Sequence, residues 1–300
     1  MKVKDIYIDL NKLIMEKEVS KHLNKKDYIT CLKIAMDICI NPNFLEYRNF
    51  LLSTWHNSKE RTFFDNILYS FVISVFLQKI YLGELNPDKR EELKSLCMDG
   101  LSGRNWAEYY YNKPFDEDIY FFDKVNKRLE SLCHSHLIVQ VGCSSGKDIA
   151  LFAKNFPSNY YIGTDPYESV IDFCNEKHNL PNLEFMVASA KTINKSFTII
   201  SDLPILVIDN GSLQYVQAEH LNMFFNKIKF WKAEIILNNP ITTGALEKYS
   251  GRPSFKGNFS YNYDYKVIAE INGIKTIEFI YESSKKNKDI SYYHYHGIGE

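Results

Sequence analysis

From Leu137 onward the chain alternates short apolar runs with amphipathic segments, and this alternation constrains the fold more than any other feature. Five runs have the length and composition of buried strands: LIVQV (137–141), YYIGT (160–164), EFMVA (184–188), ILVID (205–209) and EIILN (234–238). Helical segments fit around 147–155, 167–178 and 218–231. Strands that alternate with helices predict a parallel sheet covered by helices on both faces.

The end of the chain departs from this alternation. A helix is expected over about 263–272, where Gly273 is a good C-cap residue. Two strand-like runs follow, 274–283 and 289–298, joined by the polar segment SKKNK (284–288). They predict a hairpin. The expected fold class is therefore α/β, with a mostly parallel seven-stranded sheet that closes in an antiparallel C-terminal hairpin.

The first third of the chain predicts helices instead. Apolar residues recur with a helical period over 63–82. The segment 100–115 has little regularity and is interpreted as a junction, and a helix is expected over 116–132, where three acidic residues suit the first turn. The predicted domains are thus an N-terminal helical region, 1–112, and a main domain, 113–300.

Composition limits the expected partners and the cellular location of the protein. Lys and Arg total 36 against 37 Asp and Glu, a net charge of -1 that gives no electrostatic reason to expect nucleic acid. The most apolar stretch, 67–77, is shorter than the ~18 residues needed to span a membrane. The N-terminus carries charges throughout, unlike a signal peptide, and the six cysteines form no CxxC pair. We expect a cytoplasmic protein without a membrane partner.

The segment LIVQVGCSSGKD (137–148) is the central motif. A buried strand runs into Gly142-Cys143-Ser144-Ser145-Gly146, and a helix follows. Glycines allow a sharp turn and the close approach of a ligand. The N-terminus of the following helix offers free N–H donors to a carboxylate or phosphate.

Three further elements follow strands of the predicted sheet. Asp165 ends the second strand, 23 residues after Gly142, where an acidic residue accepts hydrogen bonds from ribose hydroxyls in dinucleotide-binding units. Residues 187–190 (VASA) end the third strand and residues 209–212 (DNGS) the fourth. Ligands of open α/β sheets bind outside the carboxyl ends of the strands, which is where all these elements fall.

Together these motifs resemble the class I S-adenosylmethionine-dependent methyltransferase superfamily, a Rossmann-like fold. VGCSSGKD is similar to its first motif, YIGTD to its second and ILVIDNGSLQYV to its fourth-strand motif, while the terminal hairpin is similar to its last two strands. The resemblance covers 137–300. One departure is Ala188-Ser189-Ala190, which stands where the superfamily often has an acidic residue. GSLQYV (211–216), IILNNPITTG (235–244) and SYNY (260–263) resemble methyltransferases associated with surface-polysaccharide and small-molecule pathways.

The resemblance implies S-adenosylmethionine as the cofactor and assigns roles to residues. Gly142, Ser144 and Gly146 would line its methionine end and ribose, and Asp165 would hold the ribose hydroxyls. The remaining cofactor residues would be Ser189 and Ala190 beside the adenine, and Asp209, Asn210 and Gly211 beside the sulfonium and the acceptor.

A hydroxyl acceptor also needs its proton removed, which predicts a base near the carboxyl ends of the later strands. The candidates are Asp209, His220, Tyr263, His294 and His296, of which Asp209, Tyr263 and His294 are the expected catalytic residues. His294 and His296 share one face of a strand, but a metal would need further ligands, so no metal site is predicted. The expected substrate is a small molecule or sugar, and the N-terminal helices could form a homodimer.

Other functions stay open. The G-x-S-x-G pattern also fits the nucleophile turn of an α/β-hydrolase using Ser144, followed by Asp209 and His294. No HG-type segment precedes the turn, and the spacing of Asp165 would then have no purpose. An NAD-dependent oxidoreductase fits less well, because serine stands at 144 where G-x-G-x-x-G has glycine. A catalytically inactive S-adenosylmethionine-binding module is the third alternative.

Overall fold

The computed structural model describes residues 103–114, 119–193, 202–250, 252–257, 260–284 and 288–299. The chain divides into two units, Met1–Ser102 and Gly103–Glu300, and all described residues belong to the second. The helices predicted before residue 100 therefore lie outside the described residues. The predicted domain boundary at residue 112 stays a prediction.

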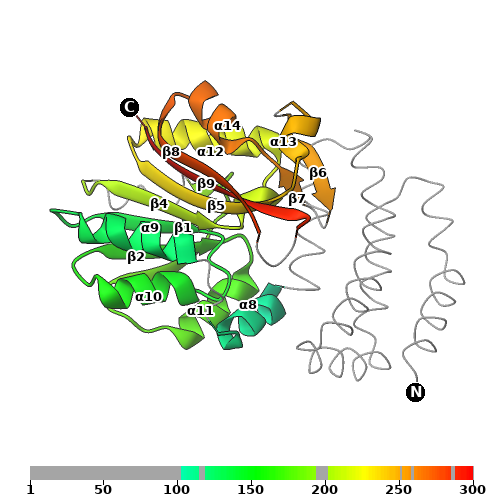
Figure 1. Ribbon diagram of the computed structural model, residues 1–300. Coiled ribbons are helices and arrows are strands. Elements are labelled where there is room, and N and C mark those ends of the chain that lie inside the picture. The colour runs from blue at the N-terminus through cyan, green and yellow to red at the C-terminus, as the bar shows by residue number, and fades with distance from the viewer. Residues whose placement is uncertain are drawn as a thin grey trace, which may run out of the picture. The chain divides into compact units, whose positions relative to one another are not determined.

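Seven strands of the described part form one sheet (Figure 1). These strands are β1 (Leu137–Val141), β2 (Tyr160–Asp165), β3 (Leu183–Val187), β4 (Ile205–Asn210), β5 (Glu234–Thr242), β8 (Ile274–Ser283) and β9 (Ile290–Gly299). Their order across the sheet is β3-β2-β1-β4-β5-β9-β8. The first five are parallel, and β9 runs antiparallel to both β5 and β8. This confirms the predicted sheet and its C-terminal hairpin.

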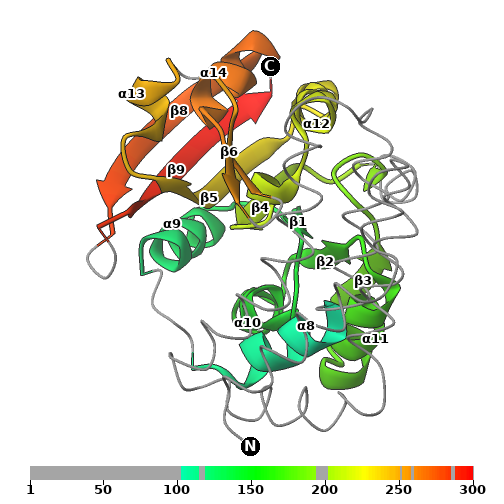
Figure 2. The same cartoon turned by 90° about the vertical axis from the view of Figure 1, so that its right-hand side faces the viewer.

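Helices cover both faces of the sheet (Figure 2). They are α8 (Gly103–Asn112), α9 (Ile119–Glu130), α10 (Lys147–Asn155), α11 (Glu168–Lys177), α12 (Ala218–Phe230), α13 (Ala245–Lys248), α14 (Tyr265–Ile271) and the 3-10 turn η3 (Leu213–Tyr215). Helices α9, α10 and α11 pack on one face, and α12 and α14 on the other. We call these the α9 face and the α12 face.

Each central strand contributes to both cores, because successive side chains point to opposite faces. In β4, Val207 packs into the core on the α12 face and Ile208 into the core on the α9 face. All five residues of β1 are buried. Burying one large apolar side chain stabilises the fold by about 1.5–3 kcal/mol. Because both faces of these strands are covered, an apolar residue at every position adds stability, which explains their continuous apolar runs.

The predicted lack of regular structure over 100–115 was wrong for 103–112, which form helix α8. Tertiary contacts hold this helix on α11. Arg104 forms an ion pair with Glu176 at 2.5 Å, and the ring centroids of Tyr111 and Phe173 lie 5.8 Å apart. The aromatic residues of this segment therefore stabilise a helix that its local pattern does not indicate.

A second feature absent from the prediction is a short hairpin of β6 (Ser254–Gly257) and β7 (Ser260–Asn262), which follows α13. Asn262 Oδ1 accepts a hydrogen bond from Thr242 N at 2.7 Å, which ties the hairpin to the carboxyl end of β5. The insertion thus lies at the edge of the sheet where a ligand is expected. Across the described residues, no helix has the length and apolar character needed to cross a membrane.

Candidate functional site

The glycine turn after β1 has an unusual backbone. Gly142, Ser144 and Gly146 all adopt positive φ angles, of 63°, 49° and 68°. A Cβ atom on Gly142 would lie 2.2 Å from the Cβ of Ser212, and one on Gly146 would lie 2.7 Å from the ring of Phe185. Only glycine fits these two positions, for steric as well as conformational reasons.

Asp165 joins this turn directly. Its carboxylate accepts hydrogen bonds from Ser144 N and Tyr167 N, both at 3.2 Å, and the residue is buried. The pairing of β1 with β2 brings the two segments together, because Val141 lies opposite Thr164. The pairing therefore places the Asp165 carboxylate at the glycine turn, although Asp165 follows Ser144 by more than 20 residues in the sequence.

Ser189 and Ala190 follow β3. Ser189 N donates to Thr192 Oγ1 at 2.9 Å, and its own hydroxyl lies 3.1 Å from the same oxygen. Ala190 is buried in the core on the α12 face. Ala188 N donates to Asp165 O at 2.9 Å, so the segment borders Asp165. The expected adenine contacts of Ser189 and Ala190 stay predictions.

Asp209 is completely buried, and its carboxylate organises the turn after β4. Oδ1 accepts from Ser212 N at 3.0 Å and Leu213 N at 3.1 Å, while Oδ2 accepts from Asn239 Nδ2 at 2.5 Å. Burial raises the pKa of Asp209 to about 6, against hydrogen bonds from Ser212 and Asn239 that lower it. These hydrogen bonds favour a role for Asp209 in positioning the turn over a role as a general base.

Asn210 and Gly211 lie at the same edge of the sheet. Asn210 Nδ2 donates to Asp148 Oδ2 at 3.3 Å, and Asn238 Nδ2 donates to Asn210 Oδ1 at 2.8 Å. Gly211 has a φ of 86°, and its N–H donates to Asn238 O at 2.7 Å. A polar row thus links the start of α10 with the ends of β4 and β5.

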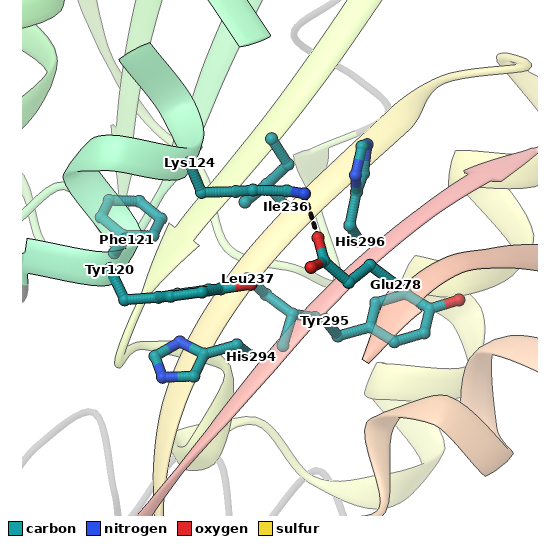
Figure 3. Close-up of a pocket in the computed structure, with 9 residues that line it drawn as sticks. All are labelled: Tyr120, Phe121, Lys124, Ile236, Leu237, Glu278, His294, Tyr295 and His296. Carbon is teal, nitrogen blue, oxygen red and sulfur yellow. Dashed lines mark hydrogen bonds and ion pairs between the residues drawn. The ribbon is translucent and has the colours of Figure 1, made fainter. Parts of the chain in front are cut away.

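The structure does not bring the three expected catalytic residues together. Tyr263 is completely buried in the core on the α12 face, and its hydroxyl donates to Val216 O at 2.7 Å. His294 lies on the α9 face, beside Tyr120 at a centroid distance of 4.1 Å (Figure 3). Burial lowers the pKa of His294 to about 4, a shift that Glu278 partly opposes. His294 is therefore uncharged at pH 7, and the catalytic roles stay predictions.

Sequence reasoning missed Lys256, which projects from β6 toward this edge. Its Nζ donates to Pro240 O at 2.6 Å and also to Gln214, whose own amide donates to Gly211 O at 2.6 Å. Burial lowers the pKa of Lys256 to about 8. No local pattern marks this lysine, because its position depends on a hairpin that the sequence does not predict.

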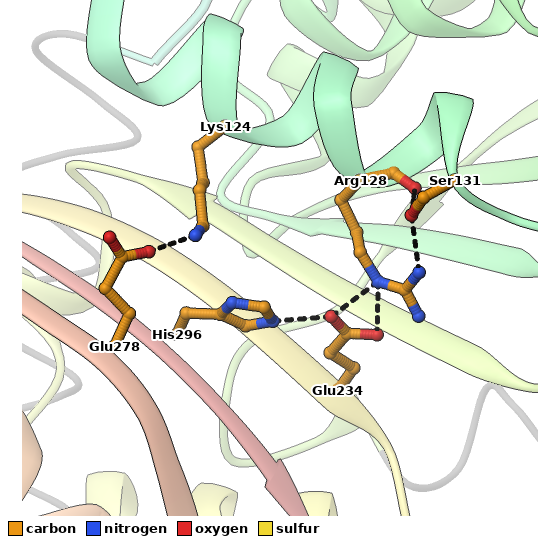
Figure 4. Close-up of polar contacts among 6 residues, drawn as sticks. All are labelled: Lys124, Arg128, Ser131, Glu234, Glu278 and His296. Carbon is orange, nitrogen blue, oxygen red and sulfur yellow. Dashed lines mark hydrogen bonds and ion pairs between the residues drawn. The ribbon is translucent and has the colours of Figure 1, made fainter.

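Ion pairs hold α9 against the outer strands of the sheet (Figure 4). Arg128 Nε lies 2.7 Å from Glu234 Oε1, and His296 Nε2 lies 2.5 Å from the same oxygen. Lys124 pairs with Glu278 one turn earlier on α9. Burial alone would raise the pKa of Glu234, but hydrogen bonds from His296 and Arg128 outweigh it and hold the pKa at about 2.

Replacing Glu234 with glutamine is expected to lower the free energy of unfolding by about 2 kcal/mol at pH 7, because Arg128 and His296 lose a shared carboxylate that is 9% exposed. A carboxyl with a lowered pKa stabilises the fold above its unfolded pKa, and this stabilisation disappears as pH falls toward 2. The difference from wild type should therefore shrink between pH 5 and pH 2.

Urea unfolding at pH 7 and pH 3 measures both effects. Glu176→Gln is the matched control, since its ion pair with Arg104 is about half exposed and screened by solvent, so its loss should change the stability much less. An equal loss of unfolding free energy in Glu234→Gln and Glu176→Gln would contradict the role of Glu234 in holding α9 on the sheet.

Comparison with known proteins gives one curated relative. No protein-family model matches the chain. The chain is 24% identical over 119 residues to phthiotriol/phenolphthiotriol dimycocerosates methyltransferase 1 of Mycobacterium ulcerans (strain Agy99). The match covers 36% of this chain and 44% of that protein, so the chain spans less than half the length of this relative.

Solved structures are similar at lower identity. Magnesium protoporphyrin IX methyltransferase from Synechocystis PCC 6803, with bound S-adenosylmethionine, has a TM-score of 0.49 and 13% identity, covering 72% of this chain and all of that one. The [4+2]-cyclase SpnF has a TM-score of 0.46 and 11% identity, covering 60% of this chain and 79% of that one.

Proposed function

We propose that this chain binds S-adenosylmethionine at the carboxyl ends of β1, β2 and β4 and directs its methyl group to the hydroxyl of a small molecule or sugar. The observation that carries the proposal is the Asp165 carboxylate, held 3.2 Å from Ser144 N inside the glycine turn. The similarity to the methyltransferase of Mycobacterium ulcerans supports the same activity.

The donor and acceptor groups at this edge fit a nucleoside with a charged amino-acid tail. A carboxylate accepts up to about four hydrogen bonds, so ribose hydroxyls can join the two backbone donors of Asp165. The start of α10 suits the carboxylate of the tail. The residues proposed to hold the cofactor are Gly142, Ser144, Gly146, Asp165, Ser189, Ala190, Asp209, Asn210 and Gly211.

When bound, S-adenosylmethionine would supply a methyl group on a positively charged sulfur; its transfer to a hydroxyl oxygen would break the sulfur–methyl bond, leave neutral S-adenosylhomocysteine and release the hydroxyl proton to water or to a base. The role of the protein is to hold the donor and acceptor in line, which lowers the activation barrier by ~7–11 kcal/mol in favourable cases. We assign Asp209 to positioning, because it fixes the turn that carries Asn210 and Gly211. A cytoplasmic location, a homodimer through the N-terminal helices and a substrate other than nucleic acid belong to the same proposal.

The hydrolase alternative requires Ser144, Asp209 and His294 to meet. Asp209 lies opposite Leu237 in the pairing of β4 with β5, whereas His294 lies opposite Asn238 in the pairing of β5 with β9. Adjacent residues of a strand point to opposite faces, so the carboxylate and the imidazole lie on different sides of the sheet. The geometry therefore favours the methyltransferase over the hydrolase.

The proposed activity is tested by incubating the full chain with methyl-labelled S-adenosylmethionine and a panel of small hydroxyl compounds and sugars. Ester hydrolysis is assayed in parallel on wild type and Ser144→Ala. Label transfer supports the proposal. Cofactor binding without transfer to any acceptor favours the inactive binding module, and ester hydrolysis that disappears in Ser144→Ala would establish the hydrolase.

A further inference from the structure

None of the three residues expected to be catalytic offers a general base at the proposed cofactor edge. Asp209 uses both of its carboxylate oxygens to fix the turn after β4. The hydroxyl of Tyr263 donates to Val216 O, and His294 lies on the opposite face of the sheet. Methyl transfer to a hydroxyl nevertheless benefits from a group that takes up the hydroxyl proton. A base for this step must come from another residue.

Lys256 reaches this edge because of a bulge in the β6–β7 hairpin. Phe255 pairs with Tyr261 and Gly257 pairs with Ser260, so Lys256 is the extra residue on its strand. Bulges re-aim a side chain and are over-represented next to active sites. The hairpin itself is tied to the carboxyl end of β5 (Figure 1). The bulge thus explains how a lysine of a short hairpin comes to lie at the strand ends.

Two neutral oxygen atoms hold the Lys256 amine. Its Nζ donates to Pro240 O at 2.6 Å and to Oε1 of Gln214. Both partners border Gly211, because a Cβ atom on Gly211 would lie 3.7 Å from Nε2 of Gln214 and 3.9 Å from Cδ of Pro240. Gly211 is one of the residues proposed to lie beside the cofactor. The Lys256 amine is therefore separated from the proposed site by a single side chain.

The surroundings of Lys256 favour its uncharged form. Burial lowers the pKa of Lys256 to about 8, and no carboxylate of the described residues opposes this effect. An uncharged amine has two N–H groups and one lone pair. The two N–H groups match the two oxygen acceptors, which leaves the lone pair to take up a proton. A base is most effective when its pKa lies near the working pH.

We propose that Lys256 is the general base of the methyl transfer, with its amine held by Gln214 and Pro240 and its lone pair turned toward the acceptor hydroxyl. Lys256 can act in this way only if the proposed function holds. Lys256 takes the hydroxyl proton while the hydroxyl oxygen forms a bond to the methyl carbon; the sulfur–methyl bond breaks and its electron pair stays on sulfur. The positive charge thereby passes from sulfur to the Lys256 ammonium, which later releases the proton to water.

This role has a measurable consequence for charge. Because a bound sulfonium and the Lys256 ammonium carry like charges, binding of S-adenosylmethionine should lower the pKa of Lys256 by about 1. S-adenosylhomocysteine, whose sulfur is neutral, should leave it unchanged. By linkage, the affinity for S-adenosylmethionine relative to S-adenosylhomocysteine should rise about fivefold between pH 7 and pH 9. The two compounds share their amino and carboxyl groups, so this ratio isolates the charge on sulfur.

The titratable groups on the elements around Lys256 are Tyr261 on β7, Tyr215 on η3, Asp209 on β4 and Glu234 at the opposite end of β5. The pKa of Asp209, about 6, and that of Glu234, about 2, lie below the range from pH 7 to pH 9. Replacing Lys256 leaves both tyrosines in place, so a pH dependence that came from them would persist in the variants.

Calorimetric titration of both compounds into the full chain at pH 7 and pH 9 measures the ratio of affinities. Lys256→Met, which keeps the length of the side chain but has no amine, should remove the fivefold rise. Lys256→Arg, which stays charged at both pH values, should hold the ratio at its low value. Lys248→Met is the matched control, because Lys248 is exposed on α13 of the same insertion, and it should retain the rise.

NMR of the unaltered chain with 13C-labelled lysine side chains gives the pKa of Lys256 directly, so the test does not depend on the folding of a variant. We expect a pKa near 8 in the chain alone and with S-adenosylhomocysteine, and a lower value with S-adenosylmethionine. The same pKa with both bound compounds, or a ratio of affinities that does not change with pH, would overturn the role of Lys256.

The labelling assay adds a kinetic readout. On a panel hydroxyl that accepts label from wild type, Lys256→Met should lower kcat at least about 100-fold and remove the rise of the rate with pH. An unchanged kcat would overturn the assignment of the base. If neither compound binds to wild type, the proposed function fails and the role of Lys256 fails with it. If both bind and the pKa of Lys256 does not distinguish them, only the role of Lys256 is overturned.

Discussion

Replacing Gly142 with alanine is expected to lower the free energy of unfolding by about 2–5 kcal/mol and to abolish binding of S-adenosylmethionine. A φ of 63° costs an alanine about 1–2 kcal/mol, and forcing a methyl group into a packed space costs typically 1–3 kcal/mol more. The new Cβ would lie 2.2 Å from the Cβ of Ser212, which no side-chain rotation can move away. Urea unfolding and cofactor titration measure the two effects.

A double-mutant cycle isolates the collision. Ser212→Gly removes the atoms that the new methyl group meets, so Gly142→Ala should cost less in the Ser212→Gly background than in wild type. Gly244→Ala is the matched control for backbone strain alone, because Gly244 has a φ of 74° and no heavy atom within 4 Å of the added Cβ. If Gly142→Ala lowered the free energy of unfolding by no more than Gly244→Ala does, this result would contradict the close packing of the turn.

The second large effect is expected for Asp209→Ala, which should lower the free energy of unfolding by about 3–5 kcal/mol. The substitution leaves the N–H groups of Ser212 and Leu213 and the amide of Asn239 without their carboxylate, inside a completely buried site. Ser212→Ala, which removes only one hydroxyl, is the comparison and should cost about 1 kcal/mol. Urea unfolding at pH 7 that ranked the two variants equally would show that Asp209 does not organise the turn.

The pH dependence of Asp209 has the opposite sign to that of Glu234. Its folded pKa of about 6 lies above the ordinary value of 3.8, so the protonated form stabilises the fold and this contribution is lost as pH rises through 6. The unfolding free energy of wild type relative to Asp209→Asn should therefore decrease between about pH 4 and pH 6. A flat difference over this range would place the pKa of Asp209 near its ordinary value.

The central sheet is predictable from the sequence because parallel strands covered on both faces must be apolar throughout. The run LIVQV coincides with β1, and the two runs of the C-terminal hairpin coincide with β8 and β9 to within one residue. Helix α8 could not be predicted in the same way. Its stability comes from packing on α11, such as that between the rings of Tyr111 and Phe173, which joins segments distant in the sequence.

The candidate site is predictable only as far as it follows the strand ends. The rule that ligands bind at the carboxyl ends of parallel strands locates the glycine turn and Asp165, and the structure brings the two into contact. The environment of Asp209 depends on Asn239 in the neighbouring strand, and the environment of His294 depends on Tyr120 of α9. Such neighbours are set by tertiary packing, which a one-dimensional pattern does not encode.

The most direct test of the proposed cofactor site is a calorimetric titration of S-adenosylmethionine and S-adenosylhomocysteine into wild type and Asp165→Ala, with Glu176→Ala as a control for loss of a surface carboxylate. We expect micromolar binding to wild type and Glu176→Ala, and binding at least about tenfold weaker in Asp165→Ala, because a buried acceptor of ribose hydrogen bonds is lost. No binding to wild type, or equal binding to Asp165→Ala, would contradict a cofactor site at Asp165.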